Sequence, residues 1–301
     1  MSDLTVASLG NLSESELIIE GFLARYRGNT LHGYKTDLRM FKRWCDDNEL
    51  DLLTIKRVHL DLFMRYMAEE CGHSKATVYR RINAVKSMYL YAAEEDFIDK
   101  SPARALHPPR PNWGELPPVA LTPSEFQQLL AAAVNPVDHA LVAILGYLGL
   151  RITEALSIDV GDYDEIHDGH RIVRFVGKGD VPAMAPVSDA LYEIICAAAG
   201  DRTEGPLLAR EDGSRMPRRT ACRVLDRLSK AAGLTKRVTP HCLRHTFVVS
   251  AIDAGVHMRV IQLAARHKDI STTVIYDRQR QVPMSKHAAH DVAAFLDKDA
   301  S

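Results

Sequence analysis

The strongest constraint on the fold of this 301-residue chain is a cluster of prolines about one third of the way along it. Seven of its fourteen prolines fall between Pro102 and Pro123. Proline lacks a backbone N–H and blocks helix continuation, so no long helix crosses this stretch. The chain is therefore predicted to have two domains, residues 1–101 and residues 121–301, joined by a proline-rich linker over residues 102–120.

The segment before the linker is predicted to be a small helical bundle, because its apolar residues recur at intervals of three and four. Two stripes carry the pattern: Tyr34, Leu38, Phe41 and Trp44, then Ile82, Val85, Tyr89 and Ala92. After the linker, Thr122 is predicted to cap a helix that has Pro123 at its first position and Glu125 in its first turn. Further on, RIVRFVGKGDVPAMAPV is predicted to form a β-hairpin with Lys178 at its tip. The expected fold is mainly α with a small antiparallel β-sheet.

Composition excludes several classes of protein. With 46% apolar residues the chain can bury a core, and its longest apolar run is too short to span a bilayer. The five cysteines form no C-x-x-C pair, which argues against a disulfide framework and a zinc knuckle. Because 38 Lys and Arg balance 39 Asp and Glu, overall charge does not favour a nucleic-acid partner. We expect a globular cytoplasmic protein without a membrane partner, whose basic surfaces, if any, are local.

Four fragments carry candidate catalytic residues: GLRITEALSI, VGKGD, TPHCLRHTF and ARHKDISTTVIY. The candidates in them are Arg151, Lys178, His241, Arg244, His267 and Tyr276. Each has an ordinary alternative by itself, since an arginine at a helix start is often structural, a lysine at a hairpin tip is usually only solvated, and a helical tyrosine usually belongs to the core. The full set and its order favour a shared catalytic role.

Taken together, the fragments resemble the tyrosine recombinase (phage integrase) family. That family's pattern runs G-x-R-x-x-E-x-L, then a hairpin lysine, then H-x-L-R-H-T, then a histidine followed nine residues later by a tyrosine. The corresponding positions here begin at Gly149, Lys178, His241 and His267 and end at Tyr276. The resemblance implies an N-terminal helical core-binding (SAM-like) DNA-binding domain and a mixed α+β catalytic domain. Because few residues precede the predicted bundle, we expect an Xer-like member without a separate arm-binding domain.

The resemblance also implies an activity: site-specific DNA recombination through a 3′-phosphotyrosine intermediate, in integration, excision or dimer resolution. Tyr276 would be the nucleophile, and its phenol stays protonated near neutrality until a phosphate is bound. Arg151 and Arg244 would hold the phosphate with permanently charged forks. His241, or otherwise His267, would take or orient the phenolic proton, and Lys178 would protonate the leaving 5′ oxygen. Because the intermediate conserves bond energy, no ATP, metal or other cofactor is expected.

Local spacing agrees with these roles. His241 and Arg244 are one helical turn apart and can face one phosphate, in a helix that Thr239 is predicted to cap. The alternative for His241 and His245 is a zinc pair, but no H-E-x-x-H carboxylate lies between them and no third ligand is indicated. Glu154 is predicted to be structural, holding Arg151 or a helix end.

One position departs from the family pattern. Glycine usually precedes the second histidine, and Arg266 stands there in this chain. Glycine would permit a left-handed helix end, whereas arginine must either adopt that conformation at a cost or avoid it.

Two surfaces are predicted to contact DNA. Between residues 219 and 232, an apolar stripe is opposed by four basic residues, Arg219, Arg223, Arg227 and Lys230. In the N-terminal bundle, a cation, an amide and two hydroxyls share the face opposite the apolar stripe: Thr77, Arg80, Asn83 and Ser87. For the basic face between residues 219 and 232, a merely solvated surface is the alternative. Two domains joined by a linker would then close around the duplex as a clamp.

Partners and competing functions complete the predictions. The tail is predicted to form a short helix with one apolar face, made by Ala289, Val292, Ala293, Phe295 and Leu296. This face is expected to dock either on its own chain or on a neighbouring copy. The resemblance implies double-stranded DNA sites and other copies of the chain as partners, a dimer on each site and a tetramer in synapsis. The alternatives are a type IB topoisomerase and a DNA-binding accessory factor without catalysis.

Overall fold

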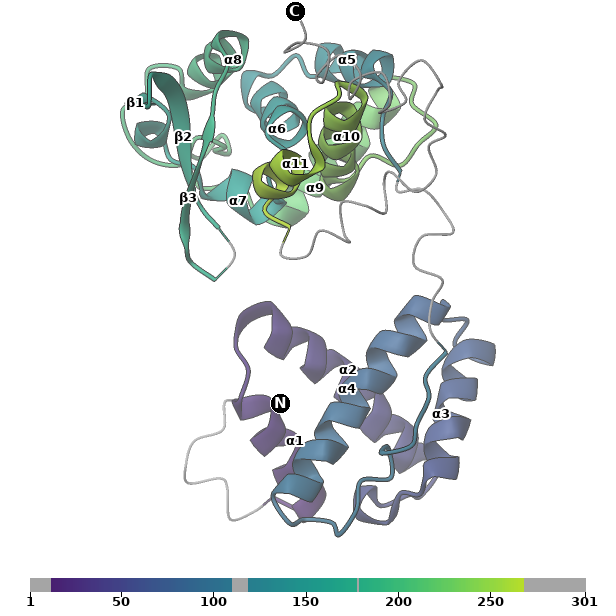
Figure 1. The fold of residues 1–301 in the computed structure, drawn as a ribbon. Helices are drawn as coiled ribbons and strands as arrows, with labels where there is room; N and C mark the ends of the chain where they lie inside the picture. Colours follow the sequence, from purple (N-terminus) through teal and green to yellow (C-terminus); the bar gives the residue numbers. More distant parts are fainter. Residues whose placement is uncertain (1–11, 110–118, 178, 268–301) are drawn as a thin grey trace, which may run out of the picture. The chain divides into compact units, whose positions relative to one another are not determined.

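The computed structural model describes residues 12–109, 119–177 and 179–267, and the chain divides into two compact units, residues 1–113 and 114–301 (Figure 1). Lys178, Tyr276 and the apolar face predicted in the tail lie outside the described residues. The domain boundaries at residues 101 and 121 stay a prediction.

The N-terminal unit is built from four α-helices and one short 3₁₀ helix within its described residues. They are α1 (Glu14–Ala24), α2 (Gly28–Asp47), η2 (Leu52–Thr54), α3 (Arg57–Glu69) and α4 (Lys75–Glu94). The side chain of Ser13 caps α1 in a reciprocal box with Glu16, and Ser74 caps α4. Helix α4 contacts α1, α2 and α3, so it is the central helix of the unit (Figure 1).

The core of this unit confirms the predicted helical stripes. All their members are buried except Tyr34, which is half-buried against the core. Tyr89 is buried and donates its hydroxyl to the carbonyl of Leu52 at 2.9 Å, so the one polar atom of this large side chain is satisfied. Ala103 and Leu106, within the segment predicted as a linker, are buried in the same core. The first part of that segment therefore packs on the N-terminal unit.

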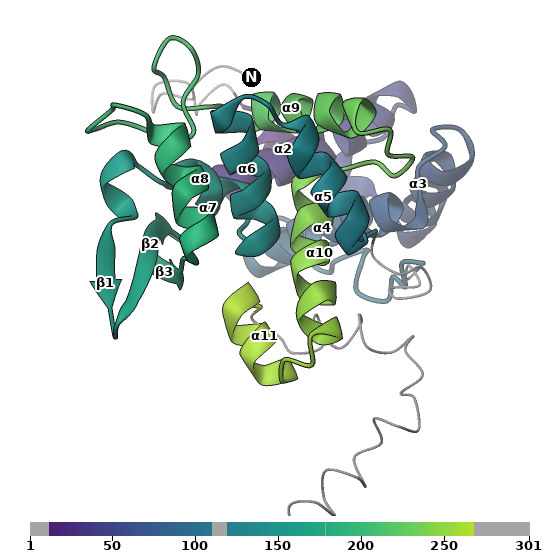
Figure 2. The same ribbon diagram turned by 90° about the horizontal axis from the view of Figure 1, so that it is seen from above.

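The second unit contains helices on one side and a small sheet at its edge (Figures 1 and 2). Its helices and 3₁₀ turn are α5 (Pro123–Ala132), α6 (Pro136–Tyr147), α7 (Ile152–Ser157), η3 (Val160–Asp162), α8 (Asp189–Ala199), α9 (Arg218–Ala231), α10 (Pro240–Asp253) and α11 (Met258–Ala265). The predicted start of α5 is confirmed, because Thr122 and Glu125 form a capping box with Pro123 in the first turn. No helix among the described residues is long and apolar enough to cross a bilayer.

The sheet has three antiparallel strands in the order β1 (Glu165–His167), β2 (His170–Val176) and β3 (Pro182–Pro186). The predicted hairpin is confirmed as β2 and β3, and the amide of Gly177 donates to the carbonyl of Val181 at 2.8 Å. Strand β1 was not predicted. All three of its residues are exposed, so it lacks the apolar alternation that indicates a strand.

The core of the second unit is centred on α6, which packs against α5, α8, α9 and α10. Its residues from Ala140 to Gly146 are all buried, which explains the long apolar run there. Val173 and Phe175 of β2 join the same core. The sheet and the helices are therefore one packed body, with the chain around α7 between them.

Candidate active site and nucleic-acid interface

Arg151 precedes α7 as its N-cap residue, and Glu154 holds it there. The backbone N–H of Arg151 donates to Oε2 of Glu154 at 2.7 Å, and its Nη1 donates to Oε1 at 2.8 Å. Glu154 is 1% exposed, whereas the Arg151 side chain keeps 34% of its surface. The prediction that Glu154 is structural is confirmed, because this carboxylate holds both the helix end and the guanidinium.

Arg244 lies on α10 and is buried, with only 4% of its surface exposed. Its Nη1 donates to the carbonyl of Gly149 at 2.5 Å, and its Nη2 donates to the carbonyl of Ala265. One planar guanidinium thus bridges the turn before α7 and the last turn of α11. A fork of this shape ties two backbone segments to one charge, which a lysine cannot reproduce.

The first turn of α10 is formed as predicted. Thr239 accepts from the amide of Cys242 at 3.1 Å, with Pro240 at the first position of the helix. His241 is exposed and Leu243 is buried, so the helix divides into an outward and a core-facing side. The rings of His241 and His245 pack edge to face with their centroids 4.1 Å apart.

His267 lies just past Arg266, the C-cap residue of α11, and hydrogen bonds of its backbone hold it in place. Its amide donates to the carbonyl of Gln262 at 3.0 Å, and its carbonyl accepts from Nε2 of the same residue at 3.1 Å. Burial, together with the positive charges of Arg244 and Arg151, lowers the pKa of His267 to about 4. The pKa of His241 is also lowered, because the protein around its ring desolvates it although the residue keeps an exposed surface, and the same two arginines add to the shift. Both imidazoles are therefore neutral near pH 7 and able to accept a proton.

The structure thus brings four of the six candidate catalytic residues into one electrostatic neighbourhood. Arg244 and Arg151 donate to the carbonyls of Ala265 and Arg266, the two residues before His267. His241 lies one helical turn before Arg244 on α10. Two fixed cations next to neutral imidazoles are suited to binding a phosphate while leaving a base available. Within the described part of the chain, no three or more His, Cys, Asp or Glu side chains are grouped so that they could hold a metal ion.

Arg266 adopts the left-handed conformation that its position demands, with φ 52° and ψ 44°. Its guanidinium donates to Oε2 of Glu154 at 2.6 Å and lies 4.7 Å from the ring centre of Phe175 on β2. Its carbonyl accepts from Nη2 of Arg151 at 3.0 Å. Of the two outcomes open from the sequence, the arginine therefore takes the strained conformation and does not avoid it.

Two contributors near this site were not found from the sequence. Ser157 donates its hydroxyl to the carbonyl of Glu154 at 2.8 Å and accepts from the amide of Val176 at 2.9 Å, which ties the end of β2 to α7. Nothing in the spacing of Ser157 signals this. From the sequence, Gly149 is only the first position of a motif. In the structure it has φ +59°, and its carbonyl accepts a hydrogen bond from Arg244, so it is part of the site.

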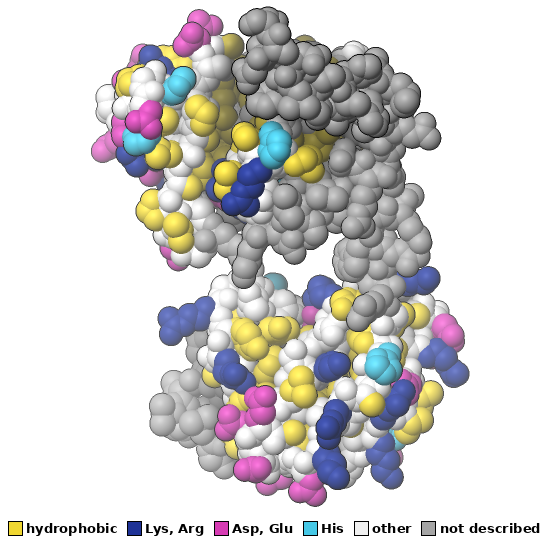
Figure 3. Space-filling model, in the orientation of Figure 1, with side chains coloured by type: hydrophobic (Ala, Val, Ile, Leu, Met, Phe, Trp, Pro, Cys, Tyr) yellow, Lys and Arg dark blue, Asp and Glu magenta, His cyan; other side chains and the backbone are white. Residues whose placement is uncertain are grey.

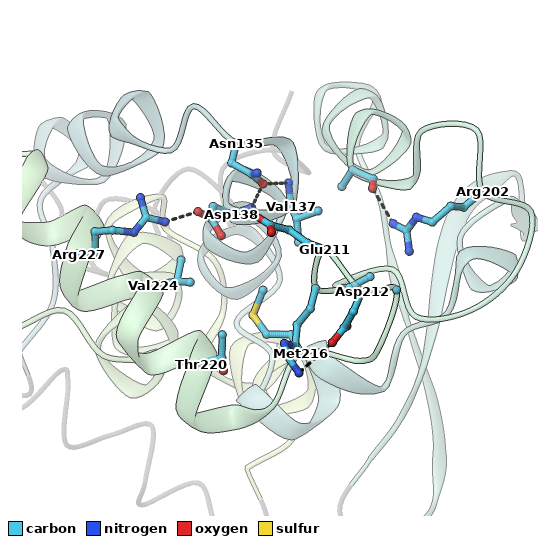
Figure 4. Close-up of a pocket in the computed structure, with 14 residues that line it drawn as sticks. Asn135, Val137, Asp138, Arg202, Glu211, Asp212, Met216, Thr220, Val224 and Arg227 are labelled. Atoms are coloured by element: carbon cyan, nitrogen blue, oxygen red, sulfur yellow. Dashed lines mark hydrogen bonds and ion pairs between the residues drawn. The ribbon is translucent and has the colours of Figure 1, made fainter.

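The basic face predicted on α9 is exposed, while Ala221, Leu225 and Leu228 on the other side are buried. Two of its four cations are engaged in ion pairs: Lys230 with Asp226 at 2.8 Å, and Arg227 with Asp138 of α6. Figure 4 shows Arg227 reaching toward Asp138 at one side of a pocket of about 800 Å³. Contact of Arg219, Arg223, Arg227 and Lys230 with DNA stays a prediction.

The predicted DNA-reading face of α4 forms one concave surface. Thr77, Arg80, Asn83 and Ser87 all line a hollow of about 660 Å³ beside Tyr34. Arg80 pairs with Asp37, which is only 2% exposed. Sequence reasoning missed Asp37, although its position four residues before Phe41 places it on the buried face of α2. On this unit, Lys and Arg side chains are spread among apolar ones over the face seen in Figure 3.

Comparison with known families decides the class of the protein. Residues 120–282 match the phage integrase family, and residues 19–96 match the phage integrase N-terminal SAM-like domain. The chain belongs to the phage integrase family. It is a tyrosine-type site-specific DNA recombinase, as the motifs indicated.

Individual relatives agree over most of the chain. The recombinase is 31% identical over 289 residues to tyrosine recombinase XerD of Mycobacterium leprae, covering 86% of this chain and 89% of that one. It is 29% identical over 272 residues to XerD of Oceanobacillus iheyensis, covering 85% and 90%. In fold it is similar to XerH bound to difH substrate, with a TM-score of 0.71 at 19% identity over 98% and 88% of the chains. A lambda integrase fragment gives 0.71 at 18% identity over 89% and 97%.

Proposed function

We propose that this recombinase cuts and rejoins DNA through a covalent 3′-phosphotyrosine intermediate formed by Tyr276. The observation that supports it most is the pair of arginines, Arg151 and Arg244, held by separate bonds beside two neutral histidines. This is the environment that a phosphodiester needs when negative charge builds up on it.

The reaction is a transesterification in which the hydroxyl of Tyr276 attacks the scissile phosphorus. A P–O bond to the phenolic oxygen forms as the bond to the 5′ oxygen breaks. The phenolic proton passes to His241 or His267, and Lys178 gives a proton to the leaving 5′ oxygen. The same steps reverse when another 5′ hydroxyl attacks. Total bond energy is conserved, so the chain's own side chains suffice for each step.

Arg151 and Arg244 act on the charge of the pentavalent phosphorus. Each guanidinium uses some of its five N–H groups on the protein, Arg151 toward Glu154 and Arg266, and Arg244 toward two carbonyls. Because their positions are fixed before DNA arrives, little reorganisation is needed in the transition state. Loss of one such donor typically costs on the order of 100- to 1,000-fold in rate.

DNA is the proposed partner, with the concave face of α4 and the basic face of α9 as contacts. XerH was solved bound to palindromic difH substrate, and lambda integrase residues 75–356 as a dimer on a core site. We carry over both features: a double-stranded recombination site, and its binding by two copies of this chain. We further propose that two such dimers meet in synapsis as a tetramer. The tail around residues 289–296 is then the proposed contact between copies.

A trapping assay tests the covalent step. The wild-type protein and Tyr276→Phe are each mixed with a pool of nicked duplexes spanning the DNA around the protein's own gene, without added metal. Nicking lets the short strand beyond the cut diffuse away, so the intermediate accumulates. The proposal predicts a DNA-linked band on a denaturing gel for the wild type and none for Tyr276→Phe. Binding without a band would favour the accessory-factor alternative.

A second assay separates the proposal from a type IB topoisomerase. A supercoiled plasmid carrying one captured site is compared with a plasmid carrying two. Recombination predicts product only when two sites are present. Relaxation of the one-site plasmid without strand exchange would favour the topoisomerase.

A further inference from the structure

We infer that Arg266 is a positioning residue for Arg151. Both arginines bind the carboxylate of Glu154, so the three side chains together keep a net positive charge next to the phosphate-binding face of Arg151. The inference rests on the proposed function, in which Arg151 binds the scissile phosphate. It concerns the one motif position where this chain carries a side chain in place of glycine.

The contacts form a closed set of three residues. Glu154 receives Arg151 on Oε1 and Arg266 on Oε2, at 2.8 Å and 2.6 Å. Arg151 in turn donates to the backbone carbonyl of Arg266 at 3.0 Å. Arg266 therefore touches Arg151 directly through its backbone and indirectly through the carboxylate that both share. Moving either guanidinium has to disturb the other.

The sharing changes the local charge. Glu154 is 1% exposed, so its charge is poorly screened by solvent. Burial opposes ionisation of Glu154, but hydrogen bonds from Arg266 and Arg151 lower its pKa, and it stays a carboxylate. With Arg151 alone, this carboxylate would make a neutral pair. With Arg266 added, the three side chains carry one net positive charge, and part of it lies at the exposed surface of Arg151.

The Arg266 side chain is itself held in place. It is 23% exposed, and its guanidinium lies over the ring of Phe175 on β2 at 4.7 Å. Phe175 is 3% exposed and belongs to the main core of the unit. The guanidinium that binds Glu154 is therefore also held by the sheet, and the position of Arg151 depends on the contact between Arg266 and β2.

The backbone conformation at residue 266 does not explain why an arginine occupies that position. A non-glycine residue in the left-handed region is disfavoured, and glycine would adopt φ 52° without penalty. Arg266→Gly consequently removes the side chain while relieving the backbone. If only the helix end mattered, this variant would be at least as good as the wild type.

The test measures the rate of covalent complex formation in a single turnover, on the nicked duplex that the wild type captures best. Arg266→Gly is expected to slow this step about 10- to 100-fold, because the Arg151 guanidinium would no longer be held in its binding position. Binding of the same duplex, measured by fluorescence anisotropy, and the thermal midpoint should change little. Arg266→Lys keeps the charge and should recover part of the rate. Arg174→Gln is the matched control, since it removes an arginine next to Phe175 that pairs with Glu165 on the exposed side of the sheet.

A double-variant cycle makes the test specific to the shared carboxylate. In a Glu154→Gln background there is no charge left to share, so Arg266→Gly should have a much smaller effect. Two results would overturn this inference while leaving the proposed function intact. One is an equal rate for the wild type and Arg266→Gly; the other is the same loss of rate on adding Arg266→Gly to the wild type and to Glu154→Gln. Absence of any Tyr276-dependent complex from the wild type would overturn the proposed function, and the inference with it.

Discussion

Gly149 offers a direct test of how tightly the site is packed, through the single change Gly149→Ala. Its φ is +59°, and a Cβ built there would lie 2.4 Å from Cδ1 and 2.7 Å from Cγ of Phe247. The left-handed conformation costs an alanine about 1–2 kcal/mol. Forcing a methyl group into a filled space costs about 1–3 kcal/mol more. Gly149→Ala is therefore expected to destabilise the catalytic unit by about 2–5 kcal/mol.

Gly233→Ala provides the matched control. Gly233 has φ +68°, but nothing lies within 4 Å of the position its Cβ would take. It should show only the backbone cost, about 1–2 kcal/mol. Urea unfolding followed by far-UV circular dichroism gives both values. Trp44 is buried in the core of the N-terminal unit, and the sequence has no tryptophan after Trp113, so tryptophan fluorescence should report an unchanged transition for the N-terminal unit.

The clash with Phe247 can be isolated in the same experiment. In a Phe247→Ala background the obstructing ring is gone, so Gly149→Ala should lose its extra cost and behave like Gly233→Ala. Covalent complex formation should also fall in Gly149→Ala, because the carbonyl of Gly149 holds Arg244. Equal costs for Gly149→Ala and Gly233→Ala in the wild-type background would refute the packing argument.

Three further outcomes are expected. Burial lowers the pKa of His245 and His267 to about 4, with smaller contributions from His241 and Arg244 for His245 and from Arg244 and Arg151 for His267. The unfolded state therefore binds more protons than the folded state below about pH 6.5. Unfolding free energy should thus fall as pH drops from about 6.5 toward 4, and the slope from urea titrations should be shallower in His245→Asn. Ser157→Ala breaks the link between β2 and α7, and should slow cleavage more than it weakens DNA binding in paired kinetic and anisotropy measurements. Arg244→Lys replaces the planar fork that bonds two carbonyls with a point-like ammonium, and should slow cleavage about 100-fold or more in single-turnover assays, while equal rates would contradict the role of Arg244.

Local features of the fold were predictable because they depend on neighbours in the sequence. The caps at Thr122 and Thr239, the stripes of the N-terminal bundle and the β2–β3 hairpin each follow from residue type and spacing within a few positions. Strand β1 was missed for the same reason, because its exposed residues leave no pattern to detect.

The sequence pointed to candidate residues for the site but not to the contacts between them. Motif order pointed to Arg151, His241, Arg244 and His267, and the fold does bring them together. The sequence held no signal that the guanidinium of Arg244 is buried against two carbonyls, since those partners lie 95 and 21 residues away. These contacts depend on how α7, α10 and α11 meet, and only the folded chain determines that.

Arg266 illustrates the difference. From the sequence it was a departure from a glycine position, with two outcomes open. The fold resolves them, because the strained arginine reaches a buried carboxylate and an aromatic ring on a distant strand. The side-chain contacts accompany a backbone conformation that would otherwise favour glycine.

The proposed mechanism depends on a bond between Tyr276 and a DNA 3′ phosphate, and this bond can be identified chemically. The trapped complex is digested with nuclease and trypsin, and the modified peptide is sequenced by mass spectrometry. We expect a nucleotide on the tyrosine of the peptide spanning residues 269–278, and a 5′ hydroxyl on the released strand that a kinase labels without prior phosphatase treatment. A nucleotide on any other residue, or a 5′ phosphate on the released strand, would contradict it.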